Sequence, residues 1–141
     1  MAGKADFTEA EWKTLCKSVT GSGMLVSLAH KDFSDSFGES SAMAKEMATQ
    51  HAHSQSQLVR DLGSTHGTGF GLTTSPQKVE TETMAALGES VALLTAKAPD
   101  ELEAYRAFVL GVANKVAEAK GGVVAEETAM IAKITAALGV A

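Results

Sequence analysis

Apolar residues recur at helical spacing along most of the chain, and the first such stretch begins near its N-terminus. Thr8 and Glu11 form a capping-box pattern, in which each side chain can bond the backbone amide of the other residue, and Phe7 can pack on Trp12. The inward face of this helix is predicted to carry Trp12, Leu15, Cys16 and Val19. We expect the Gly-Ser-Gly sequence at residues 21–23 to end the helix and a short apolar helix to follow it.

The next predicted helix is long, from residue 39 to residue 62, with Gly63 where a glycine commonly follows the last turn. Its inward stripe consists of Met43, Met47, His51, Ser54 (or Gln55), Leu58 and Leu62. Polar side chains therefore stand at turns that should be buried. The pattern indicates a helix that is either partly exposed or faces something polar.

Residues 63–75 are rich in glycine and are predicted to form a flexible loop, either a linker or a segment that orders on a partner. A helix then opens at Ser75, which can act as an N-cap before a proline at the first helical position. Two more helices are expected to open near Pro99 and Glu126, and Gly139 should end the last one.

No segment shows the alternation of apolar and polar residues that a half-buried strand requires. Of the 141 residues, 24 are alanine, 2 are proline and 5% are aromatic, a composition that favours helices over a β-sandwich or barrel. We therefore predict an all-α fold in which residues 1–141 form one domain. Its architecture is expected to be an antiparallel helical bundle or helix array of five to six helices.

The charge and the cysteine content of the chain exclude several classes of partner and site. The net charge is −5 and the 12 Lys and Arg residues form no run, so we expect no nucleic-acid partner. Cys16 is the only cysteine, which excludes an intramolecular disulfide and a multi-cysteine metal site. No apolar run approaches the roughly 20 residues of a membrane span, and no signal-peptide pattern is found, so a cytoplasmic location is expected.

A helix–loop–helix pattern closes the chain. Gly121 and Val123 lie in its turn, Glu127 follows, and residues 134–139 read Ile-Thr-Ala-Ala-Leu-Gly. This pattern, within residues 97–139, resembles the tellurite-resistance TerB-like domains and related uncharacterised bacterial helical proteins. Lys120 departs from the family pattern, which has Asp there. The resemblance implies an all-α fold and a divalent-metal site built from loop acids, and it implies no enzymatic reaction.

The acidic segment before the long helix is the first candidate site. The resemblance places Asp32 and Glu39 at acidic positions of a second helix–loop–helix, and Asp35 lies between them. Clustered carboxylates suit Ca²⁺ or another divalent cation. Ordinary helix capping accounts for the same residues, with Asp35 as a cap and Glu39 in the first turn. Both interpretations stay open.

The second candidate site is a face of the long helix, lined by Met43, Met47, Gln50, His51 and Ser54. Met and His can bind a soft metal or haem iron, although such a stripe is more often core packing. Its polar members also suit an interface with a partner or a ligand. No catalytic motif accompanies it, neither a nucleophile elbow nor a nucleotide-binding glycine pattern nor Glu-x-x-His.

Together these patterns favour a non-enzymatic bacterial helical module, with no cofactor, that acts through protein–protein association. The partner would be a second copy in a homo-oligomer or another protein, and the resemblance adds a role in stress. The alternative is a TerB-like domain that binds Ca²⁺ or another divalent metal through its loop carboxylates.

Overall fold

The computed structural model describes residues 3–29, 36–63, 75–118 and 125–139, and within these ranges the chain forms helices and no strand. The elements, in chain order, are η1 (Lys4–Asp6), α1 (Glu9–Ala29), α2 (Ser36–His53), α3 (Gln57–Gly63), α4 (Pro76–Lys97), η3 (Pro99–Glu101), α5 (Leu102–Glu118) and α6 (Ala125–Ala137). The prediction of an all-α fold with five to six helices is confirmed.

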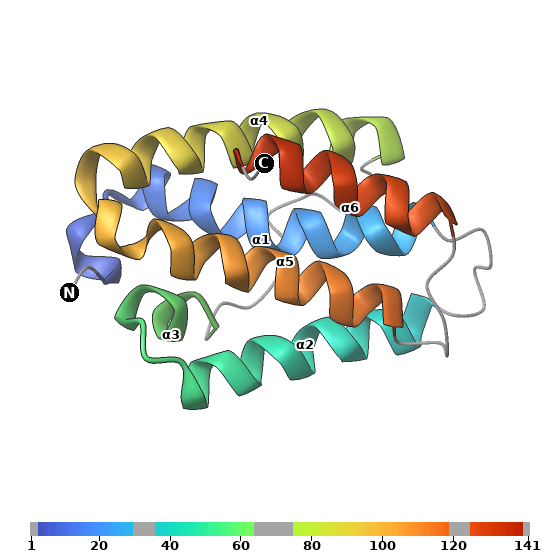
Figure 1. Cartoon of the computed structure of the whole chain (residues 1–141), viewed down its shortest axis with the longest axis horizontal. Coiled ribbons are helices and arrows are strands. Elements are labelled where there is room, and N and C mark those ends of the chain that lie inside the picture. The colour runs from blue at the N-terminus through green and yellow to red at the C-terminus, as the bar shows by residue number, and fades with distance from the viewer. Residues whose placement is uncertain (1–2, 30–35, 64–74, 119–124, 140–141) are drawn as a thin grey trace.

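The helices are arranged in three layers (Figure 1). α1 and α5 run side by side in the same direction through the middle layer. α4 and α6 cover one side of this pair, and α2 with α3 covers the other side. Since α2, α4 and α6 run opposite to α1 and α5, most neighbouring helices are antiparallel. One cluster of buried apolar side chains receives contributions from all six α-helices.

The predicted start of the first helix is confirmed. The Thr8 amide donates to Glu11 Oε1 at 2.8 Å, and the Glu11 amide donates to Thr8 Oγ1 at 3.1 Å, so both halves of the capping box form. The rings of Phe7 and Trp12 lie 6.1 Å apart between centroids. This contact directs the incoming chain onto the first turns of α1.

The predicted break at residues 21–23 is wrong, because α1 continues through these residues to Ala29. Both glycines of the segment are buried. A Cβ on Gly21 would collide with the Thr83 side chain of α4, and a Cβ on Gly23 would lie 2.5 Å from Met43 Sδ of α2. The glycines therefore allow close packing of three helices, which outweighs their cost of about 1 kcal/mol each in a helix.

The single helix predicted over residues 39–62 is also wrong, because the chain forms α2 and α3 with a short interruption at residues 54–56. Ser54 Oγ accepts a hydrogen bond from the Ser56 amide, and Ser56 Oγ accepts one from the Val59 amide, both at 3.2 Å. These side chains replace helical hydrogen bonds at the interruption, and Ser56 acts as the N-cap of α3.

Gly63 has a different role from the predicted one. It is the last residue of α3, and its φ angle is not in the left-handed region. A Cβ on Gly63 would lie 2.6 Å from the Met47 carbonyl oxygen and 2.8 Å from the His51 backbone nitrogen. The missing side chain thus lets α3 fold back onto α2.

The predicted signals in the second half are largely confirmed. Ser75 Oγ accepts a hydrogen bond from the Lys78 amide at 3.2 Å and caps α4. Gly139, with a φ of 75°, follows α6. Pro99 first opens the short η3 helix, and α5 begins after it. The glycine-rich loop lies outside the described residues from 64 to 74.

Candidate functional site

The acidic candidate site falls mostly outside the part of the chain that the structure describes. Asp32 and Asp35 lie in the gap between α1 and α2, and Glu39 lies in α2 with its side chain not among those described. Within residues 3–29, 36–63, 75–118 and 125–139, no three His, Cys, Asp or Glu side chains gather closely enough to hold a metal ion. The proposed carboxylate ligands therefore stay a prediction.

Met43, Met47 and Gln50 of the second candidate site are buried or half-buried, on a helix that packs against α3 and α5. Met47 is only 6% exposed in the apolar core, and Met43 packs against that core. Gln50 is half-buried and donates to Glu46 Oε1 at 2.9 Å. These side chains belong to the packing of α2 inside the chain.

The two remaining members of this site contact α3 through Arg60. His51 is exposed, and its Nδ1 lies 2.7 Å from the Arg60 carbonyl oxygen. Ser54 is half-buried, and its carbonyl oxygen accepts a hydrogen bond from Arg60 Nη1 at 2.7 Å. Arg60 of the following helix therefore supplies polar partners to His51 and to the Ser54 backbone.

Sequence reasoning missed a buried polar contact between the start of α3 and η3. Glu101, only 8% exposed, accepts a hydrogen bond of 2.5 Å from the Ser56 hydroxyl. Ser56 thus caps α3 and at the same time ties it to η3. The pattern Pro99-Asp100-Glu101 showed that an acid begins a helix, but it held no information on the segment that approaches it.

A second missed feature is a set of buried hydroxyls between α1, α4 and α5. Ser18 Oγ and Ser90 Oγ lie 2.8 Å apart, and the Tyr105 hydroxyl donates to the Leu15 carbonyl oxygen at 2.8 Å. Burial raises the pKa of Tyr105 far above its ordinary value, so this phenol stays protonated. Inert, satisfied hydroxyls of this kind fix how three helices pack, and they offer no reactive group to a substrate.

The outer α4 face is a strip of exposed, uncharged residues that extends over about four turns between the charged residues Lys78 and Lys97. It consists of Thr81, Ala85, Gly88, Ala92, Thr95 and Ala96. A Cβ on Gly88 would meet no atom within 4 Å. The exposed residues of the other long helices include charges, among them Lys45 on α2 and Lys115 on α5. A solvent-facing helix surface is ordinarily charged or polar, and on α6 a shorter strip of exposed residues, from Ala125 to Ala136, is uncharged as well.

Both borders of the outer α4 face carry groups that could contact a partner. On the α6 side, Met84 and Val91 are partly buried. Glu80 there forms an ion pair of 3.1 Å with Lys133 of α6, which joins the two outer helices. On the α1 side, Lys78 has a 65% exposed side chain and Glu89 is exposed.

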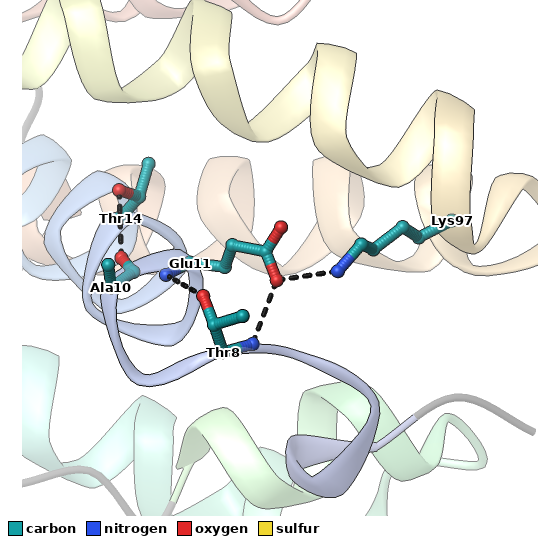
Figure 2. Close-up of polar contacts among 5 residues, drawn as sticks. All are labelled: Thr8, Ala10, Glu11, Thr14 and Lys97. Carbon is teal, nitrogen blue, oxygen red and sulfur yellow. Dashed lines mark hydrogen bonds and ion pairs between the residues drawn. The ribbon is translucent and has the colours of Figure 1, made fainter.

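A small groove lies next to Glu89, between α4 and the start of α1. Its volume is about 210 Å³, and it is lined by Ala10, Glu11, Thr14, Glu89 and Leu93. Figure 2 shows the Glu11 carboxylate between the Thr8 amide and the Lys97 ammonium, which lies 2.6 Å away. The hydrogen bond from Lys97, and then that from the Thr8 amide, hold the pKa of Glu11 below its ordinary value. Glu11 is therefore an ionised structural contact.

A second ion pair fixes the same two helices further along. Lys17 of α1 binds Glu82 of α4, and this contact is the main cause of a lowered pKa for Glu82. Lys78 reaches the other oxygen of Glu82 only at 3.9 Å. The Lys78 ammonium is thus loosely held, while the carboxylate beside it already has a close partner.

Comparison of the chain with protein-family models, curated proteins and solved structures found no match to any of them. Among the described residues, no helix is both long and apolar enough to cross a membrane.

Proposed function

We propose that this protein is a non-enzymatic helical module that works by association with another protein surface, and that the outer α4 face is its contact surface. The observation that carries the proposal is that the six exposed residues of this face, spread over about four turns, are all uncharged and mostly small. The centres of protein interfaces are depleted in charged residues in the same way.

The side chains of the outer α4 face also suit close helix contact. Ala85, Gly88 and Ala92 have small or no side chains, so a partner helix can approach the α4 backbone closely. Alanine and glycine lose no side-chain rotamer entropy when they become buried. Met84 and Val91 at the border add apolar area that water would leave on contact.

Support also comes from how α4 is held within the chain. Its inward side chains Val79, Leu87 and Leu94 are fully buried, and Lys97 and Glu82 bind α1. The outer α4 face is therefore presented on a helix that is fixed along its length. A fixed contact surface loses less conformational entropy on binding than a mobile one.

Site-specific photo-crosslinking in cells tests this proposal. A photoreactive amino acid replaces Ala85 on the outer α4 face or, as a matched control, the exposed Ala48 on α2 in the opposite layer. We expect a discrete protein adduct from position 85 and none from position 48. The absence of an adduct from every position of the outer α4 face would contradict the proposal.

A further inference from the structure

We propose that the partner of the outer α4 face is a second copy of this chain, bound through an antiparallel, two-fold α4–α4 contact. This inference rests on the proposed function and adds the identity and the direction of the partner helix. It is carried by the charges that border the face.

Two oppositely charged side chains lie on the same border of the outer α4 face. Lys78 and Glu89 are separated by about three helical turns, and at 100° per residue they lie about 20° apart around the helix. Lys78 reaches Glu82 only at 3.9 Å, and the Glu89 side chain has no hydrogen bond or ion pair within the described residues. Both groups are thus available at one edge of the face.

A two-fold axis that lies in the interface and crosses α4 at right angles reverses the helix direction but keeps each border on its own side. Lys78 of one copy then faces Glu89 of the other, and the same pair occurs a second time by symmetry. A parallel two-fold contact would move these borders to opposite sides, and neither pair would form. The charge arrangement therefore favours the antiparallel contact.

The same geometry places suitable side chains at the centre of the interface. The midpoint between Lys78 and Glu89 falls between Thr83 and Met84, so the two helices overlap over residues 76–91, with Met84 and Ala85 of each copy near the axis. Ala92, Thr95 and Ala96 lie beyond this overlap. Met84 supplies a flexible apolar side chain that adapts to its counterpart. Ala85, with Thr81 one turn before it, keeps the backbones close.

Charge reversal with rescue tests this contact. Sedimentation equilibrium at low ionic strength measures the dimer dissociation constant of the full chain, of Lys78→Glu, of Glu89→Lys and of the double variant. Each single variant places like charges opposite each other at two positions, so we expect its dissociation constant to rise by at least about tenfold. The double variant restores both pairs and is expected to lie within about threefold of the wild type.

Lys45→Glu on α2 is the matched control, since it makes the same charge change on an exposed residue of the opposite layer. It is expected to leave dimerisation unchanged. A double variant no better than the single variants, or a wild type that stays monomeric at about millimolar concentration, would overturn this inference. If the photo-crosslink from position 85 then leads to a different protein, the proposed function stands while the second copy is excluded.

Discussion

α2 and α4 are long helices in opposite outer layers, and they distribute polar side chains in opposite ways (Figure 1). α2 exposes Lys45 and turns the polar Gln50 towards the rest of the chain, and Ser54 directly after it is half-buried as well. α4 buries Ser90 among its inward apolar residues and leaves its outer face without charge. A polar inward stripe therefore does not mark an interface when the next helix folds onto it. Conversely, a helix with an apolar inward stripe does not always carry charged residues on its solvent-exposed side.

Gly63→Ala should have the largest effect on the free energy of unfolding, because it disrupts the contact between α2 and α3. The new Cβ would lie 2.6 Å from the Met47 carbonyl oxygen, so the two helices must separate. We expect a loss of about 1–3 kcal/mol in the free energy of unfolding, measured by urea denaturation. An unchanged unfolding midpoint would show that α3 does not pack on α2 in this way.

Ser56→Ala should also lower the free energy of unfolding, by somewhat less than Gly63→Ala. It removes the N-cap of α3 and leaves the buried Glu101 carboxylate without a hydroxyl donor. The expected loss in the free energy of unfolding is about 1–2 kcal/mol. Thr49→Ala on exposed α2 is the control, since the Thr49 hydroxyl bonds only its own helix, and it should unfold at nearly the wild-type urea concentration.

Gly88→Ala should stabilise the chain, in contrast to Gly63→Ala. Gly88 lies within α4 and a Cβ there meets nothing within 4 Å, so only the higher helix propensity of alanine acts. A gain of about 0.5–1 kcal/mol in the free energy of unfolding is expected. Destabilisation in the same urea experiment would mean that the outer α4 face is covered within the chain.

The ion pair between Glu11 and Lys97 is expected to make a smaller contribution to stability, and this contribution depends on pH. Because the folded chain lowers the pKa of Glu11 below 4.5, its contribution to stability is present above that pH and is lost as the pH falls further. Glu11→Gln should therefore flatten the dependence of melting temperature on pH below about 4.5. Glu9→Gln in the same helical turn is the control, and an equal flattening in both variants would assign the effect to net charge.

The effect of calcium on the melting temperature distinguishes the association proposal from the divalent-metal alternative. Association through α4 requires no metal, so millimolar Ca²⁺ is expected to leave the melting temperature unchanged. A rise that disappears in the variant Asp32→Ala/Glu39→Ala would instead support the TerB-like alternative, because a ligand that binds the folded chain stabilises it.

Sequence patterns predicted the helix ends that depend on neighbouring residues. The capping box of Thr8 and Glu11, the cap at Ser75 and the terminal Gly139 each form through contacts within a few positions of the chain. These signals, together with the absence of strand alternation, were enough for the all-α fold class.

Errors arose where a distant segment, or a hydrogen bond from a side chain to nearby backbone, decides the local structure. Glycine ordinarily disfavours helix, yet α1 continues through Gly21 because Thr83 of α4 packs against it. Ser54 and Ser56 follow the helical pattern in sequence, but their side chains bond backbone amides and interrupt the helix. For the face around Met47 the sequence left open whether the helix is partly exposed or faces something polar, since nothing in its spacing showed that α3 folds back onto α2.

The central claim is that the outer α4 face, and not the surface of α2, carries association. Sedimentation equilibrium of the wild type, Ala85→Glu and Ala48→Glu compares the two helices with the same substitution at two exposed positions. We predict that the wild type and Ala48→Glu rise from the mass of one chain, 14.6 kDa, towards twice that value with increasing concentration. Ala85→Glu should remain at 14.6 kDa. Association that survives Ala85→Glu and is lost in Ala48→Glu would contradict the account.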